Sequence, residues 1–177
     1  MPSLLPHIDP DGLLEYSVVF TDRSLNSMSV SFQTVMTDIS ALLKDAYKAA
    51  AVAVIPGGGT FGMESIARQF ANDQHVMIIR NGWFSYRWSE ILEKGKIASS
   101  TTVMMARRED TGGSNQMAPF TPVPVDEVVA TIRDEKPAVV FAPHVETSAG
   151  MILPDDYIRA VSDAVHEAGG IFVLDCV

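Results

Sequence analysis

The sequence predicts an α/β fold, a three-layer sandwich in which helices cover both faces of a mostly parallel sheet. Short runs such as 76–79 and 138–142 are apolar at consecutive positions, as in strands covered on both faces. Segments with helical spacing of apolar residues alternate with these runs, which is the order of βαβ units. The chain has 177 residues, 47% hydrophobic and 20% charged, which is the profile of one globular domain.

Each element follows from local spacing and from turn residues. Thr60 is expected to cap the second helix, and Gly169-Gly170 to stop the last one. Residues 107–124, rich in Gly, Pro and polar residues, are expected to form a long loop. The patterns predict helices over 32–47, 60–71, 84–94, 125–133 and 155–168, and strands over 51–55, 76–79, near Ile97, 102–105, 138–142 and 171–175.

Two parts are expected: an N-terminal segment over residues 1–31, irregular apart from an extended apolar patch at Val18–Phe20, and a partial domain over residues 32–177. The last seven residues read as a buried apolar strand. Domains seldom end inside such a strand, so we interpret the sequence as a piece of a longer protein.

Charge and composition limit the partners. The formal net charge of −9 argues against nucleic acid and anionic membranes, since both require a basic face. No apolar run reaches the ~18 residues of a membrane helix, and the N-terminus lacks the basic region of a secretory signal. The single cysteine, Cys176, cannot form an internal disulfide, which favours the cytosol. No metal ligand set is expected.

Ligands of parallel α/β sheets bind at the carboxyl ends of the strands. The run Gly57-Gly58-Gly59-Thr60 follows the first predicted strand and leads into a helix, whose N-terminal N–H groups and dipole favour a phosphate. The alternative is a purely structural turn. The run matches neither the dinucleotide-binding fingerprint nor a P-loop.

Three further strand ends carry candidate groups. Asn81-Gly82-Trp83-Phe84 offers two aromatic rings that either stack on a planar ligand or pack under the next helix. The loop 143–150 carries hydroxyls, Glu146 and His144, although such loops also simply form turns; we interpret His144 as a hydrogen-bonded loop residue rather than a general base. Asp175 ends an apolar strand and is either a helix cap or the partner of a cation such as a protonated pyridine.

Taken in order, these segments resemble the class V aminotransferase family of fold-type I enzymes, particularly its alanine–glyoxylate and serine–pyruvate branch. The resemblance is carried by four motifs and covers the chain from about residue 20. Ala149 departs from it, where the family usually has threonine, and the 107–124 loop is longer than the family's. The matching runs are Val54 to Thr60 with Glu64, Asn81 to Phe84, His144 to Gly150, and Val173 to Asp175, and Asn26 to Ser29 is similar to the segment before the family's first long helix.

The resemblance implies pyridoxal 5'-phosphate as cofactor, in the large domain of a homodimeric aminotransferase acting on a small amino acid and a small 2-oxo acid. It implies the following roles: Gly58, Gly59 and Thr60 bind the phosphate, Phe84 stacks on the pyridine ring, Thr147 bonds the phenolic oxygen, and Asp175 pairs with the pyridinium nitrogen. None of the five lysines (44, 48, 94, 96 and 136) is expected at this site, so the family's catalytic lysine is expected beyond Val177.

Two other functions remain open at this stage. Another class V enzyme, a cysteine desulfurase or a lyase, would share these cofactor contacts, although desulfurases usually stack a histidine where this chain has Phe84. A Rossmann-like nucleotide-binding module using Gly57 to Thr60 is the alternative outside pyridoxal phosphate chemistry.

Overall fold

The computed structural model describes Ser27, residues 30–108 and residues 118–176. The chain divides into two compact units, Met1–Ile55 and Pro56–Val177. The expected patch at Val18–Phe20 lies outside the described residues, as does the Asn26–Ser29 motif except for Ser27, which is an exposed turn residue.

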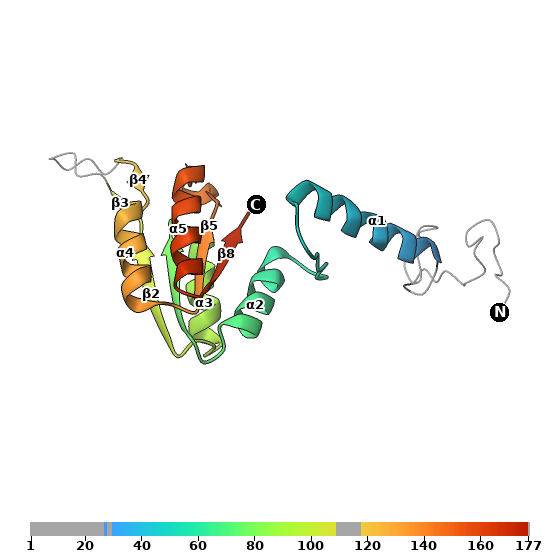
Figure 1. The fold of residues 1–177 in the computed structure, drawn as a ribbon, viewed down its shortest axis with the longest axis horizontal. Helices are drawn as coiled ribbons and strands as arrows, with labels where there is room; N and C mark the ends of the chain where they lie inside the picture. The colour runs from blue at the N-terminus through green and yellow to red at the C-terminus, as the bar shows by residue number, and fades with distance from the viewer. Residues whose placement is uncertain (1–26, 28–29, 109–117, 177) are drawn as a thin grey trace. The chain divides into compact units, whose positions relative to one another are not determined.

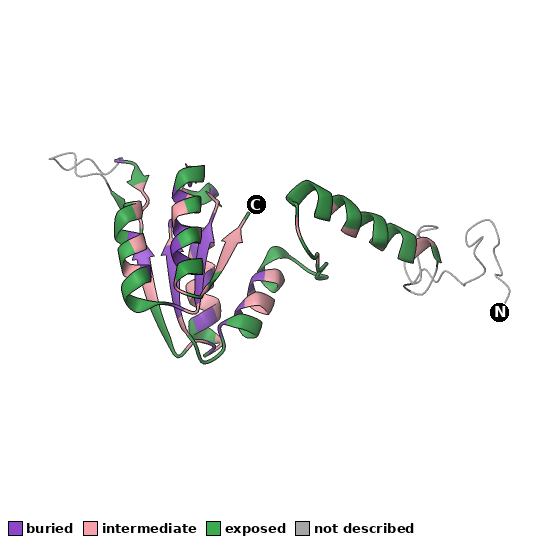
Figure 2. Ribbon diagram, viewed as in Figure 1, coloured by how far each residue is buried: buried purple, intermediate pink, exposed green. Residues whose placement is uncertain are grey.

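The first unit contains one helix among its described residues, α1 (Val30–Tyr47), which confirms the helix predicted over 32–47. The helix buries none of its residues, and Figure 2 shows it as almost wholly exposed. The strand predicted over 51–55 is wrong. A strand requires hydrogen bonds to a neighbouring strand, and these residues pair with no strand in the described part of the chain, so Val54 and Ile55 remain largely exposed.

The second unit is built on a four-stranded sheet in the order β2-β1-β5-β8 (Figure 1). All three neighbouring pairs are parallel. The strand predicted near Ile97 is wrong, because β2 begins only at Ser100, opposite the first residue of β1, and Ile97 lies buried in the preceding turn. The strands are β1 (His75–Arg80), β2 (Ser100–Met105), β5 (Val139–Pro143) and β8 (Ile171–Asp175).

Helices cover both faces of this sheet. On β1, Val76 and Ile78 belong to a core cluster with α2 and α3, while Met77 and Ile79 belong to a second cluster with α4 and α5. Successive strand residues point to opposite faces, so β1 must be apolar at both, and the predicted three-layer sandwich is confirmed. The helices are α2 (Gly59–Phe70), α3 (Trp83–Lys94), α4 (Val125–Glu135) and α5 (Asp155–Glu167).

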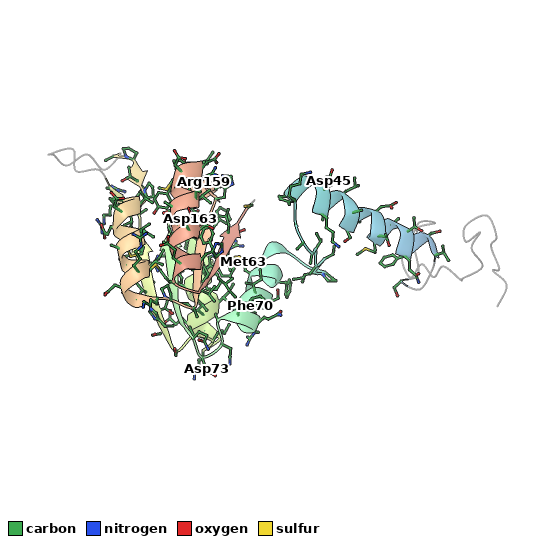
Figure 3. The ribbon with its side chains drawn as sticks, viewed as in Figure 1. Asp45, Met63, Phe70, Asp73, Arg159 and Asp163 are labelled. Carbon is green, nitrogen blue, oxygen red and sulfur yellow. The ribbon has the colours of Figure 1, made fainter. Side chains whose placement is uncertain are left out.

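Burial follows this layering. The central strands β1 and β5 are buried along nearly their whole length (Figure 2), whereas β8 is only half-buried because it is an edge strand. Helix α5 buries Tyr157 and Val161, while Arg159 and Asp163 lie on its exposed side (Figure 3).

Two short antiparallel ladders lie at the carboxyl edge of the sheet. Strands β3 (Arg107–Arg108) and β4 (Phe120–Thr121) pair at the two ends of the predicted 107–124 loop, of which 109–117 lie outside the described residues. Strands β6 (Val145–Glu146) and β7 (Met151–Ile152) pair within the loop after β5, on either side of a 3-10 turn at Thr147–Ala149. Neither ladder was predicted. In the described part of the chain, no helix is long and apolar enough to span a membrane.

Candidate functional site

The carboxyl edge of the sheet gathers the segments that the sequence singled out. Strand β1 leads into α3 at Gly82, β5 leads into the β6 loop, and β8 ends at Asp175. Helix α2 runs back toward the start of β1, so its N-terminus lies at this same edge (Figure 1). The backbone N–H of His144 donates to the carbonyl of Asp175 at 2.8 Å, which joins the β5 loop to the end of β8.

Glu146 is the most buried acid of the site, with 1% of its surface exposed. Its carboxylate accepts the backbone N–H groups of Phe84 (3.1 Å) and Ser85 (2.9 Å). It also accepts the hydroxyls of Ser85 (2.6 Å) and Ser148 (2.5 Å). Burial raises the pKa of Glu146, but these four hydrogen bonds outweigh burial and hold the pKa below its ordinary value.

This network closes the N-terminus of α3. The Ser85 hydroxyl accepts the N–H groups of Asn81 and Gly82, and the Ser148 hydroxyl accepts that of Trp83. Every N–H group from Asn81 to Ser85 therefore has a partner, and this helix start has no free donor for a ligand.

Gly82 permits this closure. A Cβ atom at Gly82 would lie 2.4 Å from Oγ of Ser148 and 2.7 Å from Cγ and Cδ of Glu146. The backbone of Gly82 is extended, with φ of 175°, so glycine is required there by the close approach of Glu146 and not by backbone strain.

The N-terminus of α2, in contrast, is open. Its N-cap is Gly58, and no side chain caps it. The expectation that Thr60 caps this helix is wrong, because the helix begins at Gly59 and the Thr60 backbone is already helical. Added Cβ atoms at Gly58 and Gly59 would meet nothing within 4 Å, so the space beside these two residues is open, while Gly57 has the positive φ (131°) that the turn requires.

Arg87 connects three of the predicted site residues. Its Nη1 donates to the Thr60 hydroxyl at 3.1 Å, and its guanidinium lies 5.2 Å from the centre of the Phe84 ring. Phe84 and Arg87 are three residues apart on α3, so they share one face of the helix. The third connection is electrostatic, since the Arg87 charge lowers the pKa of Asp175.

Asp175 is half-buried at the end of the edge strand. Burial raises the pKa of its carboxyl, the Glu146 charge raises it further, and Arg87 opposes both, so that the pKa lies above its ordinary value. A cation placed beside this carboxyl would stabilise its ionised form.

The remaining predicted residues lie on the loop after β5 and at the start of α3. Thr147 is exposed and follows Glu146 directly, and His144 takes part through its backbone, accepting from Leu153 at 2.9 Å. Phe84 is half-buried. The alternative that Trp83 packs under the helix is wrong, since 64% of this residue is exposed.

A cavity of about 380 Å³ lies beside this neighbourhood, toward β2. Thr60, Phe84 and Asp175 do not line it. Its lining includes Arg80, Asn81, Trp83, Met105, Phe120 and Ser148.

Lysines are placed at the other edge of the second unit. Lys94 ends α3 and Lys96 follows it, before β2 begins, while Lys136 precedes β5. All three therefore lie near the amino ends of the strands, away from Asp175, as the sequence predicted.

The chain is similar to several proteins of known activity. No family model matches the chain. Over 141 residues it is 30% identical to a 2-aminoethylphosphonate–pyruvate transaminase of Paraburkholderia phymatum, a match that covers 79% of this chain and 34% of the relative.

Solved structures give the fold. A ureidoglycine–glyoxylate aminotransferase of Bacillus subtilis superposes with a TM-score of 0.69 at 19% identity, over 85% of this chain and 35% of that chain. An alanine–glyoxylate aminotransferase of a Nostoc species superposes with a TM-score of 0.66 at 18% identity, over 85% of this chain and 36% of that chain. The chain has the aminotransferase fold.

The resemblance to class V aminotransferases that the four motifs indicated is thereby confirmed. The chain spans about a third of the length of the relatives that it matches.

Sequence reasoning named Glu146 and the hydroxyls of its loop as candidate groups, but it missed their role in organising the site and missed Ser85 and Arg87 altogether. Glu146, Ser85 and Ser148 form the network at α3, and Arg87 forms the bridge to α2. A carboxylate followed two residues later by a serine was visible in the sequence, but nothing in the local pattern showed that both reach α3, more than 60 residues earlier.

Proposed function

We propose that this chain is the cofactor-binding part of a pyridoxal-phosphate-dependent aminotransferase that moves an amino group from a small amino acid to a small 2-oxo acid such as glyoxylate or pyruvate. The names of the similar proteins support this acceptor class, since they refer to pyruvate and to glyoxylate. The aminotransferase fold supports the reaction class.

The observation that carries the proposal is the single neighbourhood formed by Thr60, Phe84 and Asp175 around Arg87. These three residues come from α2, α3 and β8, and each offers one of the contacts that the cofactor requires. Thr147 joins them through the adjacent Glu146, whose carboxylate also binds the N–H of Phe84.

The chemistry of these residues fits the cofactor. The open N-terminus of α2, with free space at Gly58 and Gly59, suits a phosphate monoester. Phe84 offers an aromatic face for a pyridine ring. Asp175, whose raised pKa reflects burial, gains a cationic partner if a ring nitrogen is protonated beside it.

Bound pyridoxal phosphate supplies an electron sink for the bonds at the substrate's α-carbon. The chain's own residues would bind and orient it. Gly58, Gly59 and Thr60 would hold the phosphate, Phe84 would stack on the ring, Thr147 would donate to the phenolic oxygen, and Asp175 would keep a proton at the ring nitrogen.

We further infer that residues 32–177 contribute to a large domain, that the protein is cytosolic, and that it acts as a homodimer. Exposed apolar side chains around the cavity support the dimer, namely Trp83 (64% exposed), Met105 (53%) and Phe120 (45%). Grouped exposed apolar residues are typical of interaction surfaces.

Asp175→Asn tests the proposal in the intact enzyme. The change removes the charge and keeps the shape. Since burial disfavours the ionised Asp175, stability should stay within about 1 kcal/mol of the parent or rise, whereas turnover should fall at least about a hundredfold. Asp175→Glu should give an intermediate turnover.

The control is Asp163→Asn, which removes the same charge from the exposed side of α5 and should change neither quantity. If Asp175 were only a helix cap, the Asn variant would keep near-normal turnover. Normal turnover would remove Asp175 from the site.

A further inference from the structure

Arg87 has donors that the described part of the chain does not use. Among the described residues its guanidinium makes one hydrogen bond, to the Thr60 hydroxyl, and no carboxylate lies within 4.0 Å of it. An arginine side chain carries five N–H donors. Arg68, Arg107 and Arg133 instead each pair with a glutamate.

The guanidinium of Arg87 lies close to the proposed phosphate-binding turn. A group that accepts from the Thr60 hydroxyl lies one hydrogen-bond length from Oγ1, and Nη1 of Arg87 is itself 3.1 Å from that oxygen. The guanidinium fork therefore lies beside the first turn of α2, whose N-terminus no side chain caps. Its fixed spacing matches phosphate oxygens, so two parallel hydrogen bonds can form.

The electrostatics of this edge also require a cation. Asp175 and Glu146 interact with each other there, and two carboxylates oppose a bound anion. The N-terminus of a helix contributes only about half a positive charge, which does not balance a phosphate monoester dianion. In the described part of this neighbourhood, Arg87 is the cationic side chain that contacts the phosphate turn.

We propose that Arg87 is a further binding residue of this site, donating to the same phosphate group that Gly58, Gly59 and Thr60 hold. The inference rests on the proposed function. It adds a charged contact from α3 to a phosphate site otherwise built from α2.

The test compares two ligands that differ only in the phosphate. Pyridoxamine 5'-phosphate and pyridoxamine bind without a covalent link to lysine, so their dissociation constants report the pocket itself. Equilibrium dialysis of the intact protein should show that Arg87→Gln weakens pyridoxamine phosphate about tenfold to a hundredfold. The same variant should leave pyridoxamine binding within about threefold of the parent. Arg87→Lys should recover part of the loss, since it restores the charge without the fork.

Arg68→Gln is the matched control, because it removes an arginine of α2 that already pairs with Glu64; both affinities should stay at the parent's values. If Arg87→Gln weakens both ligands equally, or neither, Arg87 does not bind the phosphate and the inference is wrong. If the parent protein binds neither pyridoxamine phosphate nor pyridoxamine, the proposed cofactor and the Arg87 contact are both refuted. Parent binding that Arg87→Gln leaves unchanged refutes the Arg87 contact alone.

Discussion

Replacing Glu146 by glutamine should destabilise the second unit and loosen the start of α3. The carboxylate accepts four hydrogen bonds through two oxygens, and each oxygen binds one backbone N–H and one hydroxyl. In either orientation, the amide of Glu146→Gln places an NH₂ group against the N–H of Phe84 or of Ser85. One buried backbone donor then loses its acceptor.

The magnitude follows from these contacts. An unsatisfied buried N–H costs about 1–3 kcal/mol, and the remaining bonds weaken because hydrogen bonds to a charged group are worth about 1 kcal/mol more than neutral ones. Relief of the burial of a charge offsets part of this loss. We expect a net loss of about 2–4 kcal/mol in the free energy of unfolding at pH 7, seen as a fall of about 10 °C in the melting temperature.

Thermal unfolding followed by circular dichroism measures this loss. Glu90→Gln is the control, because it removes a carboxylate charge from α3 itself but breaks only an exposed pair with Lys94, worth less than about 1 kcal/mol. Equal melting temperatures for the parent and Glu146→Gln would refute the role given to Glu146.

The difference in stability between the parent and Glu146→Gln should also depend on pH. The pKa of Glu146 in the folded chain lies below its ordinary value of 4.5. A lowered pKa contributes stability that is fully present above the unfolded value and is lost as pH falls through the folded value. The difference in stability between the parent and Glu146→Gln should therefore be constant near neutral pH and shrink below about pH 4.5. A difference that persists unchanged to pH 2 would mean that Glu146 is not ionised in the native state.

Two further predictions concern packing. Gly82→Ala should lower stability by roughly 2–4 kcal/mol, since its Cβ would displace Ser148 and Glu146. Gly62→Ala in α2, where a Cβ meets nothing within 4 Å, should be neutral or slightly stabilising in the same denaturant titration, and a Gly82→Ala variant as stable as this control would contradict the packing argument. Light scattering of the intact protein should give a dimer, and a stable monomer at micromolar concentration would contradict the homodimer.

The sequence alone identified the architecture and most of its elements. Apolar positions on both faces of β1 and β5 can be buried only if helices cover both faces of the sheet, and the helix periods of α3, α4 and α5 supplied such faces. The spacing of apolar residues within one helix or strand shows which of its faces will be buried, so a short window of sequence is enough to predict these elements. The placement of candidate groups at the strand ends followed from the rule for parallel sheets.

Local pattern misled where the outcome depended on a distant partner. Residues 51–55 have the composition of a strand but pair with none among the described residues, and Thr60 looks like a helix cap although α2 begins one residue before it. Hydrogen bonds between strands and at helix starts depend on which groups the fold brings close, and a short window of sequence does not contain that information.

The motifs named the residues that we propose as cofactor contacts, and the tertiary structure showed what holds these residues in place. Glu146 accepts a hydrogen bond from the backbone N–H of Phe84, more than 60 residues earlier in the chain. Arg87 donates to the Thr60 hydroxyl, 27 residues earlier. Such contacts exist only after β1, β5 and β8 have paired, because sheet pairing brings the strand ends to one edge. The residue types at the site could therefore be predicted from the sequence. The distances between them and the shifts in their pKa values depend on the assembled sheet.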